Sequence, residues 1–596
     1  MTHTLRIAGP SGELVREIES GTRLMDALSA AGAPANAPCG GKGLCGKCRV
    51  KVTGDAGPYG EPEMRLLTPA EREAGVRLAC VARVVGDLRV ESLDRSDGGQ
   101  VMTDGVASAD ELDPPASIVA LTLPPPTLDD QRADCERLLG ALGDADVDAA
   151  VLPKLPGAVR AERTHVALFR GGRAPRVTDL SGSPLRNLGV AVDVGTTTMA
   201  AYLIDLSSGA QLATCACLNP QRRHGGDVIS RADFAGTPGG LKALQSLVVG
   251  AIDDLIARML AEANADAGDV RHVVTVGNTI MMHLLAGLPV KNIAVLPFAP
   301  VYARSFDVAA ADVGLSLPGA RLTLSPCIAG YVGADTIAAI LACDMDTSPG
   351  LSLMIDIGTN GEIALGGAER MMCCSAAAGP AFEGAQIRCG SGATAGAIDR
   401  VRFVDGVINH TTIGGGMSRS ICGSGLVDAV AGMLREGIVD ETGRIDEDEA
   451  PDDYARFLFD VDNKPALSLD GRFENGVFLC QKDLREVQLA KSAIAAGIAV
   501  LMERMGATFA DITQLYLAGG FGNYIDRDGA MAIGLLPREL AGRIRPVGNA
   551  AGAGARRMLI SRSALSRAEA IRSRAGYVEL SSCPEFQDLF VENMMF

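Results

Sequence analysis

Hydrophobic and polar residues follow two different periods along this chain. Residues 4–20 alternate one by one, as the two strands of a half-buried hairpin do. Residues 22–31 and 483–504 are typical of helices. Two apolar runs, at 189–194 and 351–357, each lead into a tight turn and then into a second apolar run. The pattern predicts an α/β protein with several domains.

Changes in composition divide the chain into four parts. The apolar pattern of the N-terminal part gives way near Val90 to an acidic, turn-rich run that ends at Pro115. Beyond it, a strand-like run at 118–123 and a helix-like run at 128–142 indicate a small α+β unit. We expect an N-terminal domain at 1–93, a linker at 94–116, a small α+β middle domain at 117–185 and a two-lobed domain at 186–596.

Four cysteines form the most specific motif of the N-terminal part. Cys39, Cys45 and Cys48 share a glycine-rich loop, and Cys80 follows after 31 intervening residues. Four thiolates with one distant member are typical of [2Fe-2S] clusters, and glycines allow the close backbone wrap that a cluster needs. The alternatives are a zinc site, which usually uses two CX2C pairs, and a pair of disulfides. We predict the cluster, as metal ligands Cys39, Cys45, Cys48 and Cys80, in a β-grasp domain that resembles ferredoxins of the adrenodoxin-like class.

An Asp-X-Gly-Thr turn occurs twice in the C-terminal part, at Asp193 and again 163 residues later at Asp356. The glycine closes each hairpin sharply, and the amides and hydroxyls after it point into one concavity suited to phosphate oxygens. The aspartate at the strand end can hold Mg²⁺ through water. Two matched copies predict a duplicated fold with a nucleotide between its halves. The expected phosphate-binding residues are Gly195, Thr196, Thr197, Thr198, Gly358, Thr359 and Asn360.

A third candidate element is the strand at 514–518, which runs into a glycine-rich turn before a helix. Backbone without bulky side chains lets a flat adenine and its ribose lie close. A tight turn without a ligand is the alternative. The chain contains no GX4GK[ST] motif, which excludes a P-loop. The expected nucleoside contacts are Gly519, Gly520, Phe521 and Gly522.

Other segments allow two interpretations each. The turns at 276–279 and 547–554 favour close packing over direct roles for their side chains. Gln488 and Lys491 share one face of a helix, where they either reach the nucleotide or face solvent. The segment 373–384 is rich in small residues, so we expect a flexible loop that meets a partner or senses the nucleotide.

The overall charge limits the classes of partner. The formal net charge is -17, and no basic stripe is visible, which argues against nucleic acid. No stretch reaches the roughly 18 apolar residues that a membrane span needs. The 15 cysteines lack the density of a secreted disulfide framework, so a reducing cytoplasm is expected.

The two Asp-X-Gly-Thr turns and the glycine-rich turn together resemble the phosphate-1, phosphate-2 and adenosine segments of the ATPase fold shared by acetate and sugar kinases, actin and heat-shock chaperones. With the cluster motif in front, the whole chain resembles the reductive activators of corrinoid-dependent methyltransferases. Further motifs that carry this resemblance lie at 123–132, 219–221, 226–231, 276–279, 378–384, 421–426, 483–491 and 592–596.

This resemblance implies ATP-dependent reductive activation of a corrinoid protein. One electron would pass from the [2Fe-2S] cluster to inactive Co(II) and regenerate Co(I), with ATP and Mg²⁺ as further cofactors. Asp193 and Asp356 would act in hydrolysis, and the Ser375 hydroxyl would approach the cobalt face. A low-potential electron donor and a homodimer are further expectations.

Two other functional classes stay open. An activator of 2-hydroxyacyl-CoA dehydratases has a similar ATPase, although its cluster bridges two subunits and no ferredoxin is fused to it. A redox-sensing small-molecule kinase would use the same nucleotide turns with a metabolite as phosphate acceptor. A phosphorylated metabolite would indicate the kinase, whereas formation of Co(I) would indicate the corrinoid activator.

Overall fold

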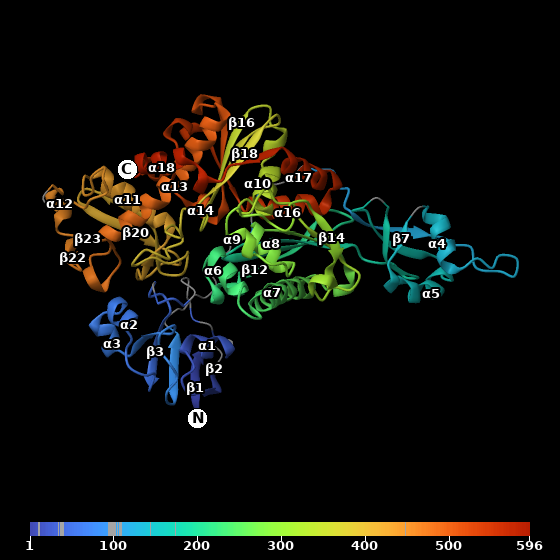
Figure 1. The fold of residues 1–596 in the computed structure, drawn as a ribbon, viewed down its shortest axis with the longest axis horizontal. Coiled ribbons are helices and arrows are strands. Elements are labelled where there is room, and N and C mark those ends of the chain that lie inside the picture. The colour runs from blue at the N-terminus through green and yellow to red at the C-terminus, as the bar shows by residue number, and fades with distance from the viewer. Residues whose placement is uncertain are drawn as a thin grey trace.

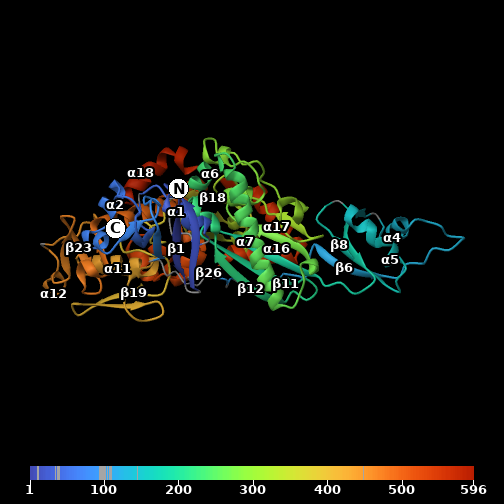
Figure 2. The same ribbon diagram turned by 90° about the horizontal axis from the view of Figure 1, so that it is seen from below.

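The computed structural model describes residues 1–596 except 10–11, 32, 34, 36–40, 44, 93–102, 104, 106–109, 144, 173 and 448. The two lobes of the C-terminal part lie side by side, and the small α+β domain projects from the first lobe (Figure 1). The N-terminal domain lies beneath the junction of the lobes, and the view from below places it in front of that junction (Figure 2). None of the helices in the described ranges combines the length and apolar character that a membrane crossing requires.

The N-terminal domain is a five-stranded sheet with the order β2-β1-β5-β3-β4. The predicted hairpin at 4–20 is confirmed as β1 and β2, and the predicted helix at 22–31 as α1. The apolar side chains of the sheet and of α1 form one separate core, which includes Leu5, Leu24 and Leu78. The elements are β1 (Thr2–Gly9), β2 (Gly12–Glu19), α1 (Leu24–Ala30), β3 (Arg49–Gly54), α2 (Glu61–Leu66), α3 (Pro69–Glu73), β4 (Val76–Leu78) and β5 (Leu88–Ser92).

The small α+β domain has a four-stranded sheet with the order β6-β8-β9-β7 and its own core around Leu138 and Val166. Its helix begins later than the sequence pattern predicts, because residues 128–133 are not helical. The elements are β6 (Ala116–Leu121), α4 (Asp134–Leu142), β7 (Asp146–Val147), α5 (Leu155–Val159), β8 (Thr164–Phe169) and β9 (Arg176–Ser181).

The first lobe is built on a six-stranded sheet with the order β12-β11-β10-β13-β15-β14. Strands β10, β11 and β12 form an antiparallel meander, and β13 and β15 continue it in parallel with β10. The elements are β10 (Leu188–Val194), β11 (Thr198–Asp205), β12 (Gln211–Leu218), the 3-10 helix η2 (Pro220–His224), α6 (Val228–Ala235), α7 (Gly240–Glu262), β13 (Val270–Val276), α8 (Thr279–Leu285), α9 (Lys291–Ala294), β14 (Phe306–Ala309), β15 (Arg321–Leu324) and α10 (Ala334–Ala342).

The second lobe repeats this plan with the order β26-β25-β16-β17-β18-β27. Here β16, β17 and β18 form the meander, and β25 and β26 lie parallel to β16. Five strands have the same order and directions in both sheets, which agrees with the predicted duplication, whereas the sixth strand lies at opposite edges, β14 beside β15 and β27 beside β18. The elements are β16 (Leu351–Ile357), β17 (Gly361–Gly366), β18 (Met371–Ala376), β19 (Ala397–Val404), β20 (Val407–Thr412), β21 (Ser420–Ile421), α11 (Gly423–Arg435), α12 (Asp452–Ala455), β22 (Leu458–Val461), β23 (Lys464–Ser468), β24 (Phe478–Cys480), α13 (Gln481–Met505), β25 (Ile512–Ala518), α14 (Gly519–Tyr524), α15 (Arg527–Ala532), β26 (Ile544–Gly548) and β27 (Ala575–Tyr577).

After β26 the chain returns to the first lobe through α16 (Ala550–Ile560) and α17 (Arg562–Arg574), which share its apolar core. The last helix, α18 (Pro584–Glu592), then packs on the second lobe. The chain thus crosses between the lobes more than once, which ties their positions together.

The described residues of the expected linker lie on the first lobe. Gly105 pairs with Gly548 at the end of β26, and the Tyr202 hydroxyl donates to the carbonyl of Thr103 over 2.8 Å. Further along, Arg557 of α16 pairs with Asp110 over 2.8 Å. This part of the linker is therefore fixed to the two-lobed part of the chain.

Gln488 and Lys491 of α13 are both buried, so the interpretation that this face is exposed to solvent was wrong. Gln488 is buried and donates to the carbonyl of Met594 over 2.9 Å. Lys491 donates to the carbonyl of Met595, and its ammonium lies 5.6 Å from the ring centre of Phe596. Burial lowers the pKa of Lys491 to about 8. These two side chains attach the C-terminal segment to the second lobe.

Candidate functional site

The first Asp-X-Gly-Thr turn joins β10 to β11, with Asp193 near the end of β10. Gly195 is required here because a Cβ atom would lie 2.5 Å from the carbonyl oxygen of Thr198. The turn is held from outside by two polar side chains. Asn219 donates to the carbonyl of Gly195 over 2.8 Å, and Arg231 donates to the carbonyl of Thr196 over 2.6 Å. The turn is therefore rigid, with its hydroxyl groups directed by fixed backbone.

Two asparagines from the turns at 276–279 and 547–554 also contact this hairpin. Asn278 caps α8 and donates to the Thr196 hydroxyl over 2.9 Å. Asn549 caps α16 and donates to the Asp193 carboxylate over 3.0 Å. Close packing was the favoured interpretation of these segments, and it missed both contacts. The sequence signal that could have indicated both contacts is a strand followed by Gly-Asn and then by a helix.

The second turn joins β16 to β17 and meets the glycine-rich segment 519–522. Gly519 has φ +83°, and a Cβ atom there would lie 2.5 Å from the Asp356 carboxylate. The segment is the first turn of α14, and the ring of Phe521 stacks on that of Phe382 with 5.1 Å between centres. The second turn and the glycine-rich segment, which are far apart in the sequence, are thus brought together.

Glu383 joins the two hairpins from opposite lobes. The Thr359 hydroxyl of the second turn donates to its carboxylate over 2.9 Å, and the Thr197 hydroxyl of the first turn donates over 3.5 Å. Burial raises the pKa of Glu383 above its ordinary value, although both hydrogen bonds oppose the shift. One carboxylate therefore sits between the hydroxyls that the sequence assigns to phosphate.

Four half-buried carboxyl groups gather between the lobes, and their charges disfavour one another. Removal from water, then the charge of Asp335, raises the pKa of Asp193 and of Asp356 to about 7 each. Burial raises the pKa of Asp335 itself to about 6. Burial and the charges of Asp335 and Asp356 raise the pKa of Glu362 well above its ordinary value. In the described part of the chain, no lysine or arginine lowers the pKa of Asp193, Asp335 or Asp356.

Ser375 is placed by a strand and not by a loop. The segment 373–376 belongs to β18, so the expected flexible loop begins only after Ala376. The Ser375 hydroxyl donates to the Glu362 carboxylate over 3.3 Å. Its neighbours Cys373 and Cys374 are fully buried in the lobe cores. The approach of Ser375 to cobalt stays a prediction.

Three of the four motif cysteines lie in the described part of the N-terminal domain, and Cys39 lies outside it. Cys48 and Cys80 are buried, with 3.2 Å between their sulfur atoms. The hydrogen bond to Cys80, and then burial, raise the pKa of Cys48. Two adjacent buried thiols fit an iron site, because metal charge is what lets such thiols ionise together. Among the described residues, no three His, Cys, Asp or Glu side chains are grouped to hold one metal ion.

A buried ion pair positions Cys80. Glu63 of α2 receives two hydrogen bonds from Arg77 of β4, over 2.8 and 2.9 Å. The amide of Leu78 donates to the same carboxylate over 2.9 Å. The bidentate geometry fixes the position of β4 relative to the rest of the sheet. It therefore also fixes Cys80, which lies two residues after the end of β4.

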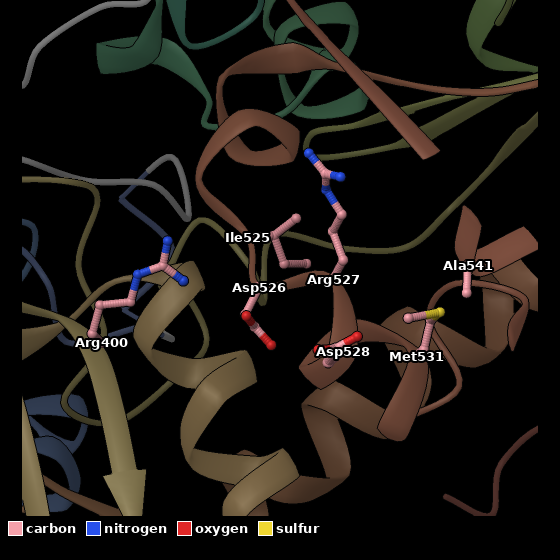
Figure 3. Close-up of a pocket in the computed structure, with 7 residues that line it drawn as sticks. All are labelled: Arg400, Ile525, Asp526, Arg527, Asp528, Met531 and Ala541. Carbon is pink, nitrogen blue, oxygen red and sulfur yellow. The ribbon is translucent and has the colours of Figure 1, made fainter. Parts of the chain in front are cut away.

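Two adjoining cavities lie beyond the glycine-rich segment. The first, of about 370 Å³, is lined by charged side chains from β19 and α15 together with apolar residues (Figure 3). The second, of about 530 Å³, shares Arg400 and Asp526 with it. The expected nucleoside contacts at 519–522 line neither of these two cavities. The lining residues of the first cavity are Arg400, Ile525, Asp526, Arg527, Asp528, Met531 and Ala541.

Family models match consecutive parts of the chain. Residues 10–85 match a 2Fe-2S iron-sulfur cluster binding domain, and residues 106–182 match a RACo linker region. Residues 188–348 match a RACo middle region, and residues 350–596 match the C-terminal ASKHA domain of RACo. A corrinoid activation enzyme, RamQ of Eubacterium limosum, is 32% identical over 607 residues, which cover 99% of each chain. The chain belongs to the RACo family.

Two further comparisons agree with membership of the RACo family. A [Co(II) methylated amine-specific corrinoid protein] reductase of Methanosarcina barkeri is 27% identical over 63% of this chain and 71% of its own. A solved structure of a reductive activator for a corrinoid, iron-sulfur protein is 32% identical, with a TM-score of 0.73, and covers 100% of this chain and 98% of its own. The expected fold class is confirmed: a [2Fe-2S] domain precedes an actin-like, nucleotide-binding ASKHA domain.

Proposed function

We propose that this RACo family chain uses ATP to drive one electron from its [2Fe-2S] cluster onto an inactive Co(II) corrinoid protein. The observation that carries the proposal is that one carboxylate, Glu383, contacts two matched turns from opposite lobes, in a chain whose N-terminal domain matches a 2Fe-2S cluster binding domain. The names of two relatives, a corrinoid activation enzyme and a corrinoid protein reductase, support a corrinoid protein as partner.

The nucleotide phosphates would lie between the two turns. Thr197 and Thr359 would donate to phosphate oxygens, and the segment 519–522 would accommodate the nucleoside. Asp193 and Asp356 would hold Mg²⁺, directly or through water. The repulsion among the four carboxyl groups supports this assignment, because a divalent cation supplies the missing positive charge.

The cysteines Cys39, Cys45, Cys48 and Cys80 would hold the cluster, which supplies one-electron transfer at low potential. Clusters of this type lie at roughly -400 mV, and reduction of Co(II) to Co(I) in corrinoids is harder still. A shortfall of about 200 mV corresponds to roughly 4.6 kcal/mol. A roughly 10⁴-fold preference of a ligand for one conformation is worth about 5.5 kcal/mol. The free energy available from nucleotide-driven movement of the two lobes is therefore large enough to make the electron transfer favourable.

The Mg²⁺ assignment makes a prediction about pH. Carboxyls with raised pKa bind protons in the folded state, so the free energy of unfolding falls as the pH rises from about 4 to about 7. Mg²⁺ should offset this loss only where the carboxyls are ionised. We expect a larger rise in melting temperature on adding Mg²⁺ at about pH 8 than at about pH 6.

Differential scanning fluorimetry of the nucleotide-free chain measures this difference. Asp335→Asn serves as the matched variant, since Asp335 raises the pKa of both Asp193 and Asp356. This variant should raise the melting temperature at about pH 8 without Mg²⁺ and shrink the effect of the ion. An equal effect of Mg²⁺ at both pH values would contradict the assignment.

Absorbance of Co(I) tests the function itself. The chain, reduced by a low-potential donor, is mixed with a Co(II) corrinoid protein in the presence and absence of Mg-ATP. We expect Co(I) to form only with ATP, and ADP to appear alongside it. Reduction at the same rate without ATP would overturn the coupling. A phosphorylated metabolite in place of Co(I) would instead identify a kinase.

A further inference from the structure

Lys47 attaches the cluster loop of the N-terminal domain to the second lobe. Lys47 lies between Cys45 and Cys48, and its ammonium donates to the carbonyl of Ile387 over 2.9 Å and to that of Gly390 over 2.8 Å. The carbonyl of Arg388 lies 3.5 Å away. Three carbonyl oxygens therefore surround one ammonium group, so that each of its three donor hydrogens has a partner. We call residues 387–390 the socket.

The socket is itself held firmly within the second lobe. The amide of Arg388 donates over 2.7 Å to Asp483, which also caps the start of α13. The amide of Ile421 donates to the carbonyl of Cys389 over 2.9 Å. The socket is therefore shaped by the lobe, and the position of the N-terminal domain depends on the position of the socket.

The same segment reaches the two phosphate turns. Glu383, which accepts from Thr359 and Thr197, lies four residues before Ile387. Between them Gly384 has φ +73°, and a Cβ atom there would lie 2.4 Å from the amide nitrogen of Ser391. The segment 383–390 thus folds tightly back on itself. Glu383 and the socket therefore belong to one short segment with a tightly folded backbone.

The N-terminal domain also faces the first lobe. Burial lowers the pKa of His224 in η2 of the first lobe. The negative charge of Asp26, in α1 of the N-terminal domain, is close enough to oppose this shift. The ribbon likewise places α1 on the side of α6 and α2 on the side of the second lobe (Figure 1). The N-terminal domain therefore extends across the junction between the lobes.

We propose that Lys47 and Glu383 form a nucleotide-controlled attachment of the cluster domain. Without nucleotide, Glu383 holds both phosphate turns and the socket holds Lys47. Phosphate needs the hydroxyls of Thr197 and Thr359 and repels the carboxylate, so nucleotide displaces Glu383, shifts the socket and loosens the N-terminal domain. The inference rests on the proposed nucleotide site between the two turns.

Hydrogen exchange of the cluster-loaded, full-length chain tests the attachment without relying on activity. Lys47→Gln should accelerate amide exchange roughly tenfold in both 41–49 and 385–391, as expected for loss of a charge-assisted hydrogen bond. Lys42→Gln, an exposed lysine in the same loop, removes the same charge and should change neither segment. Lys47→Arg should restore part of the protection. An unchanged visible spectrum of the cluster shows that each variant is loaded.

The coupling is tested with a non-hydrolysable Mg-ATP analogue on the wild-type chain. We expect protection to rise at 195–198 and 358–360 and to fall at 41–49 and 385–391. Glu383→Ala should produce the same fall without nucleotide. Protection of the turns with no change at 41–49 and 385–391 would overturn the inference and leave the nucleotide site standing. Failure of the turns to be protected would overturn both.

Discussion

Asp193→Asn is expected to lower ATP hydrolysis by about 100-fold to 1,000-fold, the usual loss when one pre-organised electrostatic contact to a reacting group is removed. The change keeps the shape of the side chain and an oxygen that can accept from Asn549. It removes one of the negative charges that would hold Mg²⁺ between the lobes. Release of inorganic phosphate, measured with saturating Mg-ATP, reports the effect.

A matched replacement of a surface carboxylate shows whether the effect comes from the loss of any negative charge or from the loss of a charge at this position. Asp460→Asn in β22 removes an exposed carboxylate of the second lobe and should leave hydrolysis unchanged. The nucleotide-free Asp193→Asn chain should be at least as stable as wild type at about pH 8, because repulsion from Asp335 and Asp356 is relieved. Hydrolysis at the wild-type rate in Asp193→Asn would exclude this carboxylate from the site.

Cys80→Ser is expected to abolish electron transfer to the corrinoid protein while ATP hydrolysis continues. A hydroxyl is a poor substitute for the thiolate that iron requires, so the cluster should be lost or weakly held. The buried pair of Cys80 with Cys48 would be broken at the same time. Visible absorbance and iron content report the cluster, and phosphate release reports the ATPase.

A second cysteine variant controls for the loss of sulfur in general. Cys135→Ser lies in α4 of the small α+β domain and should retain the cluster, the hydrolysis and the formation of Co(I). If Cys80→Ser kept a normal cluster spectrum, the assignment of this residue as a ligand would be wrong. If it lost hydrolysis as well, the two halves of the chain would depend on one another more closely than proposed.

The motifs that are local in sequence were the ones that the sequence predicted well. The hairpin at 4–20 and the duplicated meanders follow from hydrophobic periods and turn residues, because both depend on neighbours along the chain. The contact between Gly519 and Asp356 was implied only by family resemblance, since it joins residues far apart in sequence. The local sequence pattern determines which helix or strand forms, whereas the packing of the lobes determines which residues that helix or strand contacts.

Several side chains of the candidate site were missed for this reason. Asp335 lies in the first turn of α10 without any motif, yet its charge acts on Asp193 in the same lobe and on Asp356 in the other lobe. Asn549 was read as part of a packing turn because its partner lies 356 positions away. Gln488 and Lys491 were misread because the segment that covers them is the C-terminal one. Long-range contacts of this kind leave no periodic signal.

The burial of the C-terminal segment has a consequence for synthesis on the ribosome. Residues 584–596 cover one face of α13, and the amide of Phe596 donates to the carbonyl of Glu441 over 2.8 Å. The second lobe therefore cannot complete its packing while this segment is still inside the exit tunnel. The N-terminal domain, with a separate core, can fold and receive iron long before that moment. We therefore expect the N-terminal domain to receive its cluster on the nascent chain before the second lobe is complete.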